Sequence, residues 1–171
     1  ANLIPWQQLS ARTGADLAWF GITSDGRLDL SAINEVITAN TKVVSITHQS
    51  NVLGTINPLA AIVARAHEVG AVVILDACQS VPHMKIDIKS LGVDFLVFSG
   101  HKALGPTGVG VLWGHMHLLD ELPPFLFGGS MIETVSMTSA TWAPVPQKFE
   151  AGVPNMAQAV GLGAALDYLS A

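Results

Sequence analysis

Polar and titratable side chains follow three short apolar stretches of this chain, at the points where those stretches end. The stretches span residues 43–47, 71–75 and 95–98. The side chains concerned are Asn51, Asp76, Gln79, Ser99, His101 and Lys102. Apolar runs of this length predict buried strands, and ligands of open α/β sheets lie beyond the carboxyl ends of the strands. We therefore predict that these side chains gather at one site.

Lys102 directly follows a predicted strand, within the run Ser-Gly-His-Lys-Ala-Leu-Gly-Pro. A lysine that is partly desolvated, near other cationic groups, becomes an amine nucleophile or forms a Schiff base. The alternative is a solvated lysine after a strand, which is the commoner fate of this residue type.

Asp76 follows the apolar run Val-Val-Ile-Leu. A carboxylate at that place is costly unless it is paired. It could hold a metal, orient a histidine or pair with the protonated nitrogen of a heterocycle, and the alternative is a loop or N-cap hydrogen bond. Gln79 lies three residues further on and could bind the same ligand.

Ser99 and His101 flank the lysine and could donate hydrogen bonds to a phosphate, although a histidine in a loop can also have a purely structural role. Taken together, an acid for a ring nitrogen, a lysine for an aldehyde and donors for a phosphate meet the needs of pyridoxal 5'-phosphate. The residue types therefore favour an enzyme that uses this cofactor.

Alternating apolar and amphipathic segments predict the elements that position these residues. We expect strands at 16–21, 43–47, 71–75, 95–98 and 108–113, helices at 5–13, 31–38, 58–69, 116–122 and 156–171, a short helical or turn segment at 86–91, and irregular chain at 123–155. Ser31 is the candidate N-cap of its helix. The pattern predicts an α/β fold, a three-layer sandwich with a mainly parallel sheet covered on both faces.

The composition excludes several classes of protein. Half of the 171 residues are hydrophobic, 12% are charged, and the net charge is −5 with no basic stripe, so we expect no nucleic-acid partner. No apolar run approaches the ~20 residues of a membrane span. One cysteine, Cys78, excludes an internal disulfide, is typical of a reducing compartment and is expected to be a small buried apolar residue. His115 and His117 lack the spacing of metal ligands, so we expect no metal.

Five ordered motifs resemble the class V, fold type I pyridoxal-phosphate enzymes, and among them the cysteine desulfurases of the SufS/CsdA type. They are Thr-His-Gln-Ser-Asn-Val-Leu-Gly at 47–54, Asp-Ala-Cys-Gln at 76–79, Phe-Ser-Gly-His-Lys at 98–102, Gly-Gly-Ser-Met-Ile at 128–132 and Phe-Glu-Ala-Gly-Val-Pro-Asn at 149–155. The resemblance covers essentially the whole chain.

The resemblance implies a role for each candidate residue. Lys102 would hold the cofactor covalently and move protons once substrate displaces it. Asp76 would pair with the pyridine nitrogen, and Gln79 would contact the ring hydroxyl. Ser99 and His101 would bind the phosphate.

Further implied contacts concern the substrate and a second subunit. Asn51 would lie beside the cofactor hydroxyl and the substrate carboxylate. Residues 152–155 would reach the phosphate of the neighbouring subunit, since these enzymes are homodimers with shared sites. Val153 stands where the family often has threonine, so the hydroxyl of that contact is missing.

The resemblance implies release of sulfur from L-cysteine, giving L-alanine and an enzyme persulfide. The sulfur would pass to an acceptor protein for iron–sulfur cluster assembly in the cytoplasm. No residue matches the family's persulfide-forming cysteine or its substrate-binding arginine. We therefore expect residues 1–171 to be the central part of the cofactor-binding domain, truncated at both ends and inactive alone. Alternatives are a selenocysteine lyase, an aminotransferase, a kynureninase-like enzyme or a non-catalytic scaffold.

Overall fold

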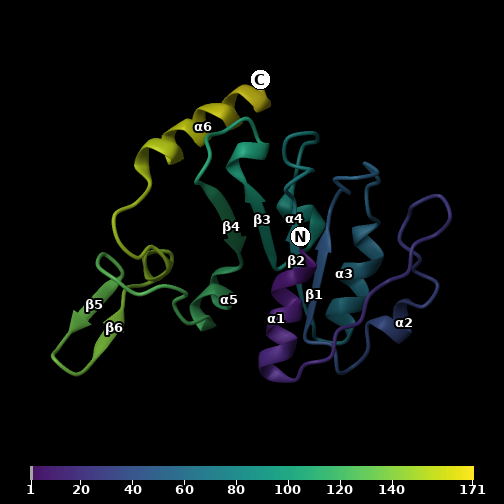
Figure 1. The fold of residues 1–171 in the computed structure, drawn as a ribbon, viewed down its shortest axis with the longest axis horizontal. Coiled ribbons are helices and arrows are strands. Elements are labelled where there is room, and N and C mark those ends of the chain that lie inside the picture. The colour runs from purple at the N-terminus through teal and green to yellow at the C-terminus, as the bar shows by residue number, and fades with distance from the viewer. Residues whose placement is uncertain (1) are drawn as a thin grey trace.

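Four strands form the central sheet of the computed structural model, which describes residues 2–171 (Figure 1). They are β1 (Val43–Thr47), β2 (Val72–Asp76), β3 (Phe95–Ser99) and β4 (Gly110–Gly114), in the order β1-β2-β3-β4. The first three are parallel, and β4 is antiparallel to β3. The sheet is therefore mainly parallel, as predicted.

Helices connect and cover the strands. They are α1 (Leu3–Thr13), α2 (Ile33–Val36), α3 (Leu59–Glu68), α4 (Ile88–Leu91), α5 (Met116–Glu121) and α6 (Met156–Ser170). Parallel strands need crossover connections, and α3 supplies the one between β1 and β2. Among residues 2–171, no helix combines the length and the apolar character that crossing a membrane requires.

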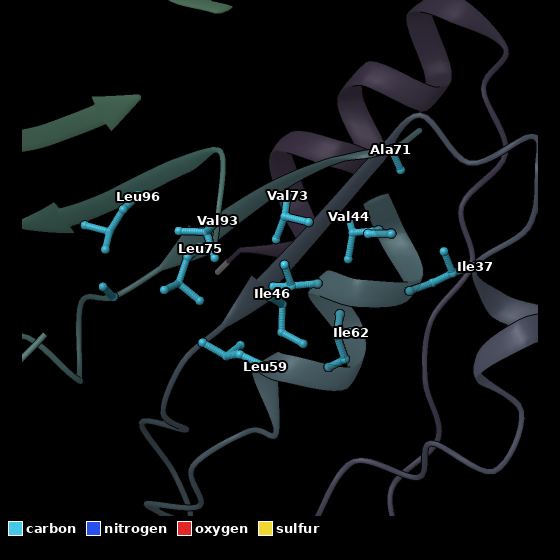
Figure 2. Packing of buried hydrophobic residues seen from close by; sticks show 13 residues of the cluster. Ile37, Val44, Ile46, Leu59, Ile62, Ala71, Val73, Leu75, Val93 and Leu96 are labelled. Carbon is cyan, nitrogen blue, oxygen red and sulfur yellow. The ribbon is translucent and has the colours of Figure 1, made fainter. Parts of the chain in front are cut away.

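The core lies between α3 and one face of the sheet (Figure 2). Ile62 of α3 packs against a layer of strand residues that includes Val44, Ile46, Val73 and Leu75. The apolar residues of α3 recur at spacings of three and four, which places them on one side of the helix. Since strand side chains alternate, the residues between these apolar ones face the other side of the sheet.

The helix α1 lies on that other side, near β1. The Ser45 hydroxyl donates to Asn2 Oδ1 over 3.2 Å, and a cavity of about 730 Å³ lies between α1, residues 15–20 and β1. None of the residues of α1 is buried, whereas α3 buries four. The two faces of the sheet are therefore covered unequally.

Three sequence predictions need correction. The expected strand at 16–21 is irregular chain, because β1 pairs with β2 alone and leaves residues 16–21 no sheet neighbour. The helix expected at 31–38 shortens to α2. Its N-cap is Ala32 rather than Ser31, whose backbone N–H instead donates to Asp29 Oδ1 in a turn.

The third correction concerns residues 123–155, which were expected to be irregular throughout. They contain an antiparallel pair, β5 (Ile132–Val135) and β6 (Ala140–Trp142), and a short 3-10 turn at Gln147–Phe149. Figure 1 shows this hairpin projecting away from the main sheet. The two strands are short and largely exposed, so they lack the buried apolar alternation by which a strand is predicted from sequence.

Candidate active site

The strand register brings the ends of β1, β2 and β3 into line. Thr47 pairs with Asp76, and Asp76 pairs with Val97. Beyond the strands, the backbone N–H of His48 donates to the Asp76 carbonyl, and that of Ala77 donates to the Val97 carbonyl, each over 2.9 Å. The segments that carry the candidate residues therefore leave the sheet side by side.

Asp76 and Ser99 lie on the same face of the sheet. Leu75 of β2 belongs to the core cluster beneath α3, and Phe98 of β3 packs against that cluster. Because successive strand side chains point to opposite faces, Asp76 and Ser99 both point away from α3. The structure therefore places these two residues at the same edge and on the same face of the sheet.

Cys78 links Asp76 to Ser99. Its backbone N–H donates to Asp76 Oδ1 over 3.0 Å, and its Sγ lies 3.6 Å from Ser99 Oγ. The thiol is half-buried rather than part of the core, which corrects the expectation of a small buried apolar residue. The turn after β2 thus fixes one carboxylate oxygen of Asp76 and places a thiol against the serine.

The turn that carries Lys102 is built on close backbone approaches. The residues Gly100 to Lys102 form a 3-10 turn. The Gly100 carbonyl accepts hydrogen bonds from the backbone of both Ala103 and Gly105. A Cβ added to Gly105 would lie 3.0 Å from Gly100 O and 2.9 Å from Leu162 Cδ1. These contacts leave no room for larger residues, which explains the two glycines.

His101 and Lys102 are themselves exposed. The sequence led us to expect a partly desolvated lysine, and residues 2–171 do not provide that cover. The structure therefore places Lys102 just beyond the strand end that bears Ser99 but does not enclose it.

Asn51 and Gln79 lie in the segments that follow β1 and β2, respectively. Asn51 is exposed on the loop after β1, whereas Gln79 is half-buried in the turn after β2. No hydrogen bond joins either side chain to Asp76, Ser99 or Lys102 among the described residues. The structure thus positions both side chains near the sheet edge without bringing them into direct contact with the others.

Two of the motifs that resemble the cysteine desulfurases meet in space. They lie at residues 128–132 and 149–155. The backbone N–H of Gly152 donates to the Gly129 carbonyl over 2.9 Å. The side chain of Asn155 donates to the Gly108 carbonyl over 2.8 Å, so this motif also contacts the loop after Lys102. Val153 is 87% exposed. The sequence motif gave no indication of the Asn155 contact, because its partner is distant in the chain.

Two buried polar atoms in the segment after β1 lack hydrogen-bond partners among the described residues. They are His48 Nδ1 and Gln49 Oε1. Burial lowers the pKa of the His48 imidazole, because desolvation disfavours its charged form. Since buried polar groups are normally paired, these two atoms are open to hydrogen bonding with a water or a ligand at this edge of the sheet.

Asn57 lies beside the candidate site, and it was not predicted from the sequence as a candidate residue. Its side-chain amide donates to the carbonyl oxygen of Thr47 over 2.7 Å. The Asn-Pro pair at 57–58 marks a boundary before α3, but no local pattern shows that the side chain reaches back to β1. This long-range contact emerges only from the fold.

The residues at this edge fit pyridoxal phosphate. One oxygen of Asp76 accepts a backbone hydrogen bond, which leaves the other for a ring nitrogen, and Ser99 presents its hydroxyl on the same face. Within the described part of the chain, no group of three or more acidic, histidine or cysteine side chains could hold a metal ion.

The profile of the family described as "Aminotransferase class-V" matches residues 1–171. The chain belongs to the class-V aminotransferase family. Members of this family depend on pyridoxal phosphate. The observed sheet and helices match cysteine desulfurase structures of the fold type I class.

Similar proteins carry the name cysteine desulfurase. The chain is 65% identical to a probable cysteine desulfurase of Streptomyces coelicolor over 170 residues, which are 99% of this chain and 41% of that protein. It is 47% identical to a cysteine desulfurase of Haloferax volcanii over 99% of this chain and 40% of that protein. This class-V chain therefore spans about 41% of the length of such a relative.

Solved structures agree with the sequence comparison. The cysteine desulfurase CsdA of Escherichia coli superposes with a TM-score of 0.95 at 39% identity, covering 99% of this chain and 42% of that chain. A structure described as SspA in complex with cysteine superposes with a TM-score of 0.78 at 28% identity, covering 96% and 44%.

Proposed function

We propose that this chain forms the central part of the cofactor-binding domain of a pyridoxal-phosphate-dependent cysteine desulfurase. In the proposed reaction, sulfur leaves L-cysteine to give L-alanine and an enzyme persulfide. The observation that carries the proposal is the common face of Asp76 and Ser99 beside the Lys102 turn. High identity to relatives named cysteine desulfurases supports this reaction over the others considered for the family.

Asp76 and Lys102 have the chemical roles in this proposal. The Asp76 carboxylate pairs with the protonated ring nitrogen of the cofactor and keeps its proton in place. Lys102 binds the aldehyde carbon and afterwards moves a proton at the substrate Cα. When bound, pyridoxal phosphate supplies an electron sink for that carbon.

The other candidate residues bind and orient. Ser99 and His101 donate to the phosphate, Gln79 contacts the ring hydroxyl, and Asn51 lies beside that hydroxyl and the substrate carboxylate. Cys78, the single cysteine, lies against Ser99 on the phosphate side. We therefore assign the thiol that takes up the sulfur to a residue outside this chain, and we expect residues 1–171 alone to be inactive.

The proposal extends to partners. The persulfide sulfur passes to an acceptor protein for iron–sulfur cluster assembly, and the enzyme is a homodimer in the cytoplasm. The names of the relatives support the sulfur chemistry, and a single cysteine is compatible with a reducing compartment. The exposed segment around Val153 supports a contact with a second subunit.

The decisive experiment maps the lysine that binds the cofactor. The protein as encoded by its gene is mixed with pyridoxal phosphate, reduced with borohydride and digested for mass spectrometry. We expect a yellow absorbance that borohydride bleaches, and a reduced pyridoxyl group on Lys102. Lys102→Arg removes both signals, whereas the control Lys89→Arg, at an exposed position in α4, retains them.

Two other results would reject the proposal. A protein with no yellow absorbance is the non-catalytic scaffold, and a label on another lysine contradicts the assigned site. In a parallel assay we expect sulfide and alanine from L-cysteine. Turnover of L-selenocysteine without turnover of L-cysteine would instead identify a selenocysteine lyase.

A further inference from the structure

The loop that follows β1 closes on itself at its base. It comprises residues 48–57, and Gln49 pairs with Ile56 in an isolated antiparallel bridge. The backbone N–H of Asn57 donates to the His48 carbonyl over 2.9 Å. The loop therefore leaves from and returns to the same point, at the carboxyl end of β1.

Bonds within the loop determine the shape of its tip around Asn51. The Ser50 hydroxyl accepts hydrogen bonds from the backbone N–H groups of Val52 and Leu53, each over 3.2 Å. The backbone N–H of Ser50 donates to the Thr55 carbonyl over 2.9 Å. All of these bonds run within the loop, so they fix its shape but not its place relative to the sheet.

The Asn57 side chain ties the base of the loop to the sheet. Its Nδ2 donates to the Thr47 carbonyl over 2.7 Å and lies 3.4 Å from Thr47 Oγ1. Thr47 is the last residue of β1 and pairs in register with Asp76, whose carbonyl accepts from His48 N. Two hydrogen bonds therefore connect the base of the Asn51 loop to the strand ends, one from the Asn57 side chain to Thr47 and one from the His48 backbone to Asp76.

Hydrogen bonding, rather than close packing, holds this side chain in place. Asn57 lines both the cavity of about 730 Å³ beside β1 and a second one of about 170 Å³. A side chain with open space beside it is free to change rotamer once its hydrogen bonds are removed. Loss of the amide donor would therefore weaken the attachment of the base of the loop to β1, which then depends on the backbone bond from His48 to Asp76.

We propose that Asn57 is a positioning residue that sets the place of Asn51 relative to Asp76. This inference rests on the proposed function, in which Asn51 contacts the cofactor hydroxyl and the substrate carboxylate. Asn57 acts through the loop and touches neither cofactor nor substrate. Its chemistry is a neutral amide that donates to a strand-end carbonyl.

The test replaces the amide in the protein as encoded by its gene. Asn57→Asp keeps the size of the side chain but removes the donor and places a carboxylate against a carbonyl. We expect kcat/KM for L-cysteine to fall roughly 10-fold, mainly through a higher KM, because one partly buried hydrogen bond is lost. Asn34→Asp makes the same chemical change at an exposed position in α2, and we expect it to leave kcat/KM unchanged.

A double-mutant cycle separates positioning from a general loss of structure. If Asn57 acts through Asn51, Asn57→Asp costs little once Asn51→Ala is present, so the two losses are not additive. Additive losses would overturn the inference. Where Asn57→Asp does not fold, Asn57→Ala enters the same cycle.

Hydrogen exchange tests whether Asn57 holds the loop to the sheet, and this measurement needs no cofactor. We expect the amides of His48 and Asn57, which donate at the base of the loop, to exchange faster in Asn57→Asp than in Asn34→Asp. Unchanged exchange would overturn the inference even if the enzyme is active. Faster exchange in a protein that has no yellow absorbance would refute the proposed function but would still support the positioning role of Asn57.

Discussion

The His48 imidazole is buried at the end of β1, and this makes folding sensitive to acid. Burial holds its pKa below the ordinary value of 6.5. Below that value the unfolded chain binds a proton that the folded chain resists, so the free energy of unfolding falls as the pH drops through about 6.5. The folded state thus favours the neutral ring.

Replacement of this histidine tests the linkage. We expect His48→Gln to lose less stability than the unchanged chain between about pH 7 and about pH 5, because the group that resists protonation is gone. Urea unfolding at several pH values measures the difference. Parallel stability curves for His48→Gln and the unchanged chain would contradict this account.

At the scale of elements, α6 packs against the turn that carries Lys102. The side chain of Leu162 is buried, and it lies against Gly105. Asn155, at the start of α6, donates to the Gly108 carbonyl in the same loop. The helix therefore contacts the segment around Lys102 at two points, Gly105 and Gly108. The helix and this segment lie about fifty residues apart in the chain.

A methyl group at Gly105 tests this support. We expect Gly105→Ala to lower the free energy of unfolding by about 1–3 kcal/mol, since the backbone oxygen of Gly100 cannot give way easily. Chemical denaturation measures the change. Gly163→Ala, within α6, meets no atom within 4 Å and should be neutral or stabilising by about 0.5–1 kcal/mol. Equal stabilities of the two variants would show that the contact has no energetic role.

At the scale of the whole molecule, the chain exposes more surface than its mass requires. Its accessible area is 11092 Å², whereas a folded monomer of this mass exposes roughly 8,000 Å². The excess includes large apolar side chains of the hairpin region, such as Phe125, Phe127 and Met137, which are at least two-thirds exposed. Such surface is normally covered by other protein.

Dye binding tests the consequence for the isolated polypeptide. We expect the 171-residue chain to enhance the fluorescence of an apolar dye such as anilinonaphthalene sulfonate, because the exposed apolar area is large. Phe125→Ser combined with Phe127→Ser should reduce that fluorescence, whereas Ser136→Ala at the hairpin tip should not. Fluorescence no higher than that of a compact monomer of equal mass would contradict the exposed surface.

Several features could be predicted from local sequence. The apolar runs at 43–47, 71–75 and 95–98 became β1, β2 and β3 within one residue, because a buried strand needs a continuous apolar segment. The amphipathic pattern of 58–69 gave α3 for the same kind of reason. The common edge of Asp76 and Ser99 was predicted from the strand ends, whereas their common face depended on the register of β2 and β3 in the folded sheet.

Other features depended on partners that are distant in the chain. The run at 16–21 has strand-like residues but stays irregular, because a strand also needs a neighbour to accept its hydrogen bonds. The exposure of Lys102 could not be predicted, because burial depends on what covers a side chain rather than on its own type.

The sequence by itself determined the three parallel strands β1, β2 and β3, the acid and amine that follow them, and the family that the motifs resemble. Only the tertiary structure decided that Cys78 meets Ser99, that Asn57 holds Thr47 and that Leu162 packs on Gly105. The reason is physical: periodicity and residue type act over a few neighbours, whereas these contacts join segments that only the folded sheet brings together.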